Sequence, residues 1–105
     1  TTTLPYGNSK PHIGHALEFI QADVLVRYFK SKNKPVFFNV GLDEHGQKIY
    51  DKSVELGLST QDFCDAQARN WQTFFDQFKI AYDSFYRTTS PLHHKKVSLV
   101  WYYFS

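Results

Sequence analysis

Two histidines three residues apart, His12 and His15, are the first residues whose types and spacing suit chemistry. They follow a segment rich in turn-forming residues and stand at the start of a predicted helix, with Gly14 between them. A helix start offers free N–H groups to anions, and two imidazoles at this spacing can both donate to one phosphate group. A glycine there lets a ligand approach the backbone closely. Two capping or surface histidines would give the same pattern, and so would part of a metal site, although a metal needs three or four ligands.

A second candidate is the acidic loop at residues 41–46, with the sequence Gly-Leu-Asp-Glu-His-Gly. A carboxylate at the end of a strand, here Asp43, can accept hydrogen bonds from a ligand ammonium group or a ribose hydroxyl. Glycine and acidic residues are also common in solvated turns, so this loop is a weak signal on its own.

The elements that must position these loops follow from the hydrophobic pattern. Helical spacing predicts an amphipathic helix over residues 14–32, whose inner face would comprise Leu17, Ile20, Val24, Leu25, Tyr28 and Phe29. A short apolar run predicts a buried strand over residues 36–40, ended by Gly41.

Three more helices and a strand are predicted downstream. A helix at about 47–56 would end at the C-cap Gly57, and the next would begin at the N-cap Ser59. Its apolar seam would comprise Cys64, Ala68, Trp71, Phe75 and Phe78. Residues 82–89 are β-prone, and Ser90-Pro91 opens a last helix. Its inner face would comprise Val97, Val100, Trp101 and Phe104.

This alternation of strands and helices predicts the α/β class, with a Rossmann-like, doubly wound parallel sheet. Ligands of such sheets bind beyond the carboxyl ends of the strands. We expect the β-prone residues 1–4 to be the end of a first strand. The loops at 5–15 and 41–46 both follow strands, so they should meet at one edge of the sheet.

Composition sets outer limits on function. The formal net charge of the 105 residues is only +2, too small to argue for nucleic-acid binding on composition alone. The single cysteine, Cys64, excludes an internal disulfide and a cysteine-based zinc finger made by this chain alone. No apolar run approaches the roughly 20 residues of a membrane span. We expect a cytoplasmic protein without a membrane partner, and a fragment of a longer chain.

Together the two loops resemble the start of a class I aminoacyl-tRNA synthetase. His12-Ile13-Gly14-His15 is similar to the "HIGH" signature of that class. Asp-Glu-His-Gly at 43–46, with residues 80–89, resembles the methionyl-tRNA synthetases. The resemblance extends over nearly the whole chain, although Leu42 stands where threonine is frequent in the family.

The resemblance implies a Rossmann-type catalytic domain. Residues 1–105 would be its N-terminal part, running into the start of a connective insertion from about residue 80. The enzyme would use ATP with Mg²⁺ to form methionyl-adenylate and transfer the methionyl group to tRNA(Met). A structural zinc would lie only in the insertion downstream, and the isolated chain would be inactive.

The resemblance also assigns roles by position. His12 and His15 would be catalytic. ATP would be bound by His12, Gly14, His15 and Glu18. Methionine would be bound by Leu4, Tyr6 and Asp43.

Two other functions stay open. An inactive nucleotide-binding or scaffold fragment would keep the fold without the chemistry. A metal site would use as ligands His12, His15, Asp43 and His45.

Overall fold

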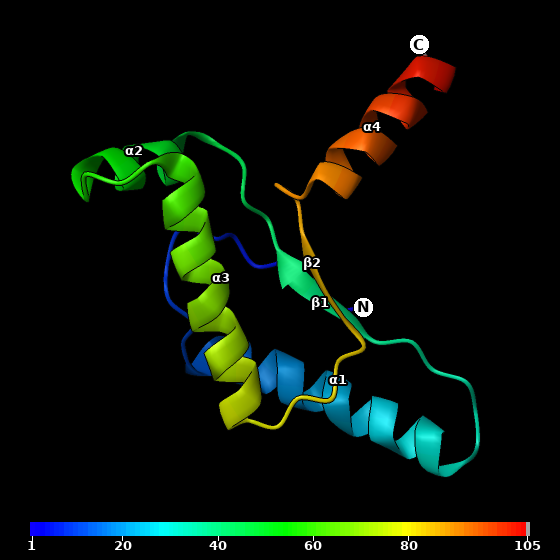
Figure 1. The fold of residues 1–105 in the computed structure, drawn as a ribbon. Helices are drawn as coiled ribbons and strands as arrows, with labels where there is room; N and C mark the ends of the chain where they lie inside the picture. The colour runs from blue at the N-terminus through cyan, green and yellow to red at the C-terminus, as the bar shows by residue number, and fades with distance from the viewer. Residues whose placement is uncertain (105) are drawn as a thin grey trace.

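The computed structural model describes residues 1–104, which form four helices and a two-stranded parallel sheet (Figure 1). The elements in chain order are α1 (Ile13–Ser31), β1 (Asn39–Leu42), α2 (Gln47–Glu55), α3 (Thr60–Gln77), β2 (Ser84–Arg87) and α4 (Pro91–Phe104). The predicted α/β class with parallel strands is confirmed. Within the described residues, no helix is long and apolar enough to cross a membrane.

β1 pairs with β2 in parallel, with Val40 opposite Phe85. The strand predicted at residues 1–4 is wrong, because the N-terminal segment makes only an isolated parallel bridge, between Tyr6 and Asp43. β1 also begins later than predicted and includes Gly41 instead of ending there. A glycine is needed at position 41 of the strand, because a Cβ there would overlap the carbonyl oxygen of Tyr86 on β2. The close approach of the two strands therefore depends on Gly41.

α1 buries a different face from the predicted one. Its buried residues are Ala16, Phe19, Asp23 and Val26. The residues predicted to face inward are between 39% and 62% exposed. The hydrophobic pattern missed the true face because Asp23 is polar. Its carboxylate accepts hydrogen bonds from Arg27 Nε (2.6 Å) and from the backbone N–H of Ala81 (2.8 Å), and so ties α1 to the segment before β2.

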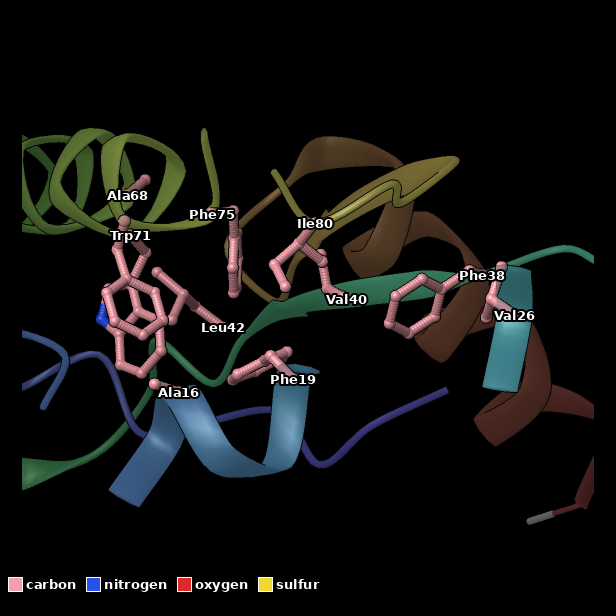
Figure 2. Packing of buried hydrophobic residues seen from close by; sticks show 11 residues of the cluster. Ala16, Phe19, Val26, Phe38, Val40, Leu42, Ala68, Trp71, Phe75 and Ile80 are labelled. Carbon is pink, nitrogen blue, oxygen red and sulfur yellow. The ribbon is translucent and has the colours of Figure 1, made fainter. Parts of the chain in front are cut away.

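The core lies where α3 packs over β1 and α1 (Figure 2). Trp71 and Phe75 of α3 are fully buried, and both rings make edge contacts with Phe19 of α1, with centroids 6.1 and 4.7 Å away. The predicted seam is confirmed at four of its five positions. Phe78 is the exception, because it is the C-cap of α3 and is 40% exposed.

The N-cap predicted for the start of α3 is confirmed, whereas the C-cap of α2 is Leu56 and not the predicted Gly57. Gly57 follows the C-cap of α2 with a left-handed φ of 67°. Ser59 Oγ caps α3 by accepting a hydrogen bond from the backbone N–H of Asp62 (3.0 Å).

α4 begins at Pro91 as predicted, with the Ser90 hydroxyl accepting a hydrogen bond from the backbone N–H of His93 (3.2 Å). Its predicted inner face is wrong. All four residues of that face are at least 50% exposed, and no residue of α4 is buried. The helix projects away from the other elements (Figure 1), which agrees with the exposure of its apolar side chains.

Candidate active site

The two histidines cap α1 together. His12 is the N-cap, and its Nδ1 accepts a hydrogen bond from the backbone N–H of Gly14 (3.1 Å). His15 Nδ1 accepts a hydrogen bond in return from the backbone N–H of His12 (3.1 Å). The rings lie close together, with centroids 3.8 Å apart and planes tilted by 32°. The three-residue spacing is therefore the spacing of a capping box, with histidines in both roles.

These bonds determine which ring nitrogen carries the proton. A neutral imidazole has one N–H donor and one acceptor nitrogen, and Nδ1 is the acceptor in both His12 and His15. The proton of each ring is thereby assigned to Nε2. Both side chains keep an Nε2–H donor for an anion, whereas a metal ion would need that nitrogen without its proton.

His15 is held between the site and the core. Its ring packs against the edge of Trp71, with centroids 4.8 Å apart, and Trp71 Nε1 donates to the Ser9 carbonyl (3.3 Å). Burial, followed by the nearby His12, lowers the pKa of His15 from its ordinary value of 6.5, while Glu18 opposes the shift. His15 is thus a neutral donor at pH 7.

Gly14 and Glu18 both have neighbours that explain their positions. A Cβ on Gly14 would lie 2.9 Å from Cε1 and 3.1 Å from Nδ1 of His12, so only glycine leaves room for the capping ring. Glu18 Oε1 accepts hydrogen bonds from the backbone N–H (2.9 Å) and the hydroxyl (2.7 Å) of Thr3. These bonds tie the N-terminal segment to α1.

The acidic loop meets the N-terminal loop at the carboxyl end of β1, as predicted. The backbone N–H of Asp43 donates to the Pro5 carbonyl (2.9 Å), and the N–H of Gly7 donates to the Asp43 carbonyl (2.7 Å). The Asp43 side chain is exposed. Leu4 lies against Gly41, so the structure brings the predicted residues Leu4, Tyr6 and Asp43 to one edge.

A buried ion pair at the residue after Asp43 was not predicted from the sequence. The Glu44 side chain is fully buried, and Arg87 Nε donates to its two oxygens (2.9 and 3.0 Å). Thr89 Oγ1 donates to Oε2 of the same carboxylate (2.6 Å). Arg87 also pairs with Asp65 (2.7 Å) and lowers the pKa of that carboxyl group. No local signal pointed to this ion pair, since Val40, Gly41 and Leu42 of β1 are all buried without alternation and Glu44 lies beyond the end of the strand.

The alternative metal site is not assembled. His45 Nε2 lies 3.0 Å from the Thr88 carbonyl oxygen, and is therefore engaged with the backbone. Across residues 1–104, no group of three or more His, Cys, Asp or Glu side chains is arranged to hold a metal ion.

A parallel α/β unit, with paired imidazoles at a helix start beside an acidic strand end, suits the binding of a phosphate and a cation side by side. The chain belongs to the family described as tRNA synthetases class I (M), whose model matches residues 1–105.

Among the relatives, the methionine–tRNA ligase of Thermosynechococcus vestitus is 48% identical over 98 residues, which are 93% of this chain and 18% of that protein. The methionine–tRNA ligase of Thermotoga maritima is 42% identical over 97 residues, or 92% of this chain and 15% of that protein. A solved structure of Mycobacterium tuberculosis methionyl-tRNA synthetase bound by methionyl-adenylate matches with a TM-score of 0.84 and 33% identity. That match covers 88% of this chain and 18% of that one, so the chain spans less than a fifth of these relatives.

Proposed function

We propose that this chain belongs to a methionine–tRNA ligase, which forms methionyl-adenylate from methionine and ATP and then transfers the methionyl group to tRNA(Met). The observation that carries the proposal is the direct backbone connection between the loop before the histidines and the loop that bears Asp43. It brings the loop that leads to His12 and His15 against the loop whose Asp43 carboxylate is exposed, where one oxygen, Oδ1, accepts from the backbone N–H of His45 (3.4 Å). Residues 1–105 would be the N-terminal part of the catalytic domain, with the insertion beginning at about residue 80.

The chemistry of adenylate formation suits these side chains. The carboxylate of methionine is ionised at pH 7 and needs no general base. One of its oxygens forms a bond to the α-phosphorus of ATP while the bond to the leaving pyrophosphate breaks. The protein must align the two anions and stabilise the charge that moves onto the phosphate oxygens. We assign this role to the Nε2–H groups of His12 and His15.

The amino-acid side of the reaction falls to the N-terminal loop and the acidic loop. Asp43 accepts hydrogen bonds from the ammonium group of methionine, and Leu4 and Tyr6 border its side chain. On the nucleotide side, Gly14 leaves room for the base. Both Thr3 bonds use Oε1 of Glu18, so we assign the second oxygen, Oε2, to the nucleoside.

In this proposal, the metal ions are not held by side chains of residues 1–104 alone. Across residues 1–104, no three His, Cys, Asp or Glu side chains gather around a possible metal position, so Mg²⁺ would arrive bound to the ATP phosphates. A structural zinc would belong to the insertion. We also propose a cytoplasmic location, which the buried free thiol of Cys64 suits.

The test is methionine-dependent ATP–pyrophosphate exchange by the full-length protein that carries these residues. Asp43→Ala should raise the KM for methionine at least about 30-fold, equivalent to about 2 kcal/mol, because the ammonium group loses its charged partner. The KM for ATP should change little. Asp51→Ala is the matched control, since Asp51 is an exposed carboxylate on α2 that contacts Gln47. The proposal fails if the wild-type protein shows no such exchange, or if Asp43→Ala leaves methionine binding unchanged.

A further inference from the structure

Glu44, next to Asp43 in the chain, has a fully buried acidic side chain whose burial calls for an explanation. Its carboxylate is fully buried and is compensated by Arg87 Nε at 2.9 and 3.0 Å and by the Thr89 hydroxyl at 2.6 Å. A buried ion pair is often no more stabilising than apolar residues of the same volume. Stability alone therefore does not account for this one, and its position beside Asp43 suggests another role.

Asp43 is anchored on both sides through its backbone. On one side it exchanges hydrogen bonds with Pro5 and Gly7, at 2.9 and 2.7 Å. On the other side, the backbone N–H of Glu44 donates to the Thr88 hydroxyl (2.8 Å). The segment 87–89 thus holds both the backbone and the side chain of the residue that follows Asp43.

The direction of the Asp43 side chain depends on that of Glu44. Asp43 is exposed while Glu44, the next residue, is buried, so the two side chains leave the backbone in different directions. A rotation that released Glu44 from its pocket would turn Asp43 away from the sheet edge. We infer that Glu44 and Arg87 form a positioning pair that orients the Asp43 carboxylate toward the ammonium group of the amino-acid substrate. This inference rests on the proposed function.

The pair also connects two parts of the chain. Arg87 is the last residue of β2 and lies opposite Leu42, the residue before Asp43. A displacement of the segment after β2 would therefore be transmitted to the proposed amino-acid site through the Arg87 side chain.

The experiment measures KM for methionine and for ATP in the exchange reaction of the full-length protein. Arg87→Gln leaves the buried Glu44 carboxylate without its cation, so the KM for methionine should rise about tenfold or more while the KM for ATP changes less than about twofold. The double variant Glu44→Gln/Arg87→Gln keeps a hydrogen-bonded pair and the net charge of the cluster. It should recover methionine KM to within about threefold of the wild type.

The matched control is Asp83→Asn. Asp83 Oδ2 accepts a hydrogen bond from the backbone N–H of Phe38 (2.7 Å) and so serves the other end of the same strand pair. It should lower the Tm without a selective change in methionine KM. If Arg87→Gln does not fold, Glu44→Gln alone, which should raise methionine KM several-fold, takes its place.

The inference is overturned if the Arg87 or Glu44 variants lower the Tm or kcat without a selective rise in methionine KM, or if the double variant is no better than Arg87→Gln. Its failure is distinct from that of the proposed function. If only this inference fails, the wild type and Asp43→Ala behave as expected, and the Glu44 and Arg87 variants show no selective change in the KM for methionine. If the proposed function fails, the wild type itself shows no methionine-dependent exchange, and both proposals are refuted.

Discussion

Replacing Gly14 with alanine should slow adenylate formation and leave the fold almost as stable as before. The new Cβ would lie 2.9 Å from His12 Cε1 and 3.1 Å from Nδ1, closer than ordinary contact, so the imidazole must move. His12 is exposed and can do so at small cost. Loss of its capping bond costs about 1 kcal/mol, and alanine in place of glycine within α1 returns up to about 1 kcal/mol. The two terms nearly cancel in the free energy of unfolding.

The effect on catalysis has no such compensation. Moving the His12 ring would move its Nε2–H donor away from the phosphate that the proposed function places beside it, and the loss of one such donor lowers the rate about 10²–10³-fold. Single-turnover formation of methionyl-adenylate by the full-length protein measures this step, and thermal unfolding measures stability in parallel.

Gly57→Ala is the matched control, because its expected effects are the reverse. Gly57 has a φ of 67° and open space around its Cα, so alanine there meets no atom but adopts a left-handed backbone. That conformation costs about 1–2 kcal/mol, and the rate of adenylate formation should not change. A normal rate in Gly14→Ala would refute the argument for the His12 donor. A raised KM for ATP with a normal rate would show instead that Gly14 serves to make room for the base.

Two further predictions concern His15. His15→Asn should slow adenylate formation less than His15→Ala, because asparagine keeps a neutral donor. Loss of a bound metal ion in either variant would contradict the donor role. The pKa of His15, measured by NMR, should lie below 6.5, rise in His12→Asn and fall in Glu18→Gln, since the first neighbour opposes the imidazolium and the second favours it. Because His15 binds a proton more readily in the unfolded chain than in the folded one, the free energy of unfolding should fall as the pH drops below about 6.5. His15→Asn should weaken that pH dependence.

Local sequence rules predicted the features that depend on neighbours in the chain. Ser59, Gly57 and Ser90-Pro91 mark helix ends because capping chemistry involves only a few consecutive residues. The meeting of the two loops was predictable for another reason, since the carboxyl ends of parallel strands share one edge whatever their sequences.

The buried face of α1 was not predictable by the same rules. Eleven apolar residues are distributed around that helix, and the pattern selected the broader apolar stripe, although the structure buries Phe19 together with Asp23. A buried carboxylate becomes acceptable only when a distant backbone N–H, here that of Ala81, reaches it. The same limit applies to Glu44, whose partner Arg87 is 43 residues away in the chain. Pairing over such distances is decided by tertiary structure.

The histidines show that a capping role and a chemical role can be one arrangement. The sequence offers capping and phosphate binding as competing explanations of His12 and His15. In the structure each Nδ1 accepts a backbone N–H, which satisfies free donors at the start of α1 and at the same time assigns the ring proton to Nε2. A histidine whose Nδ1 were free would exchange tautomers and present a donor only part of the time. The cap is therefore what makes each neutral ring a fixed Nε2–H donor, and the burial that keeps His15 neutral at pH 7 preserves its Nδ1 acceptor and so the cap.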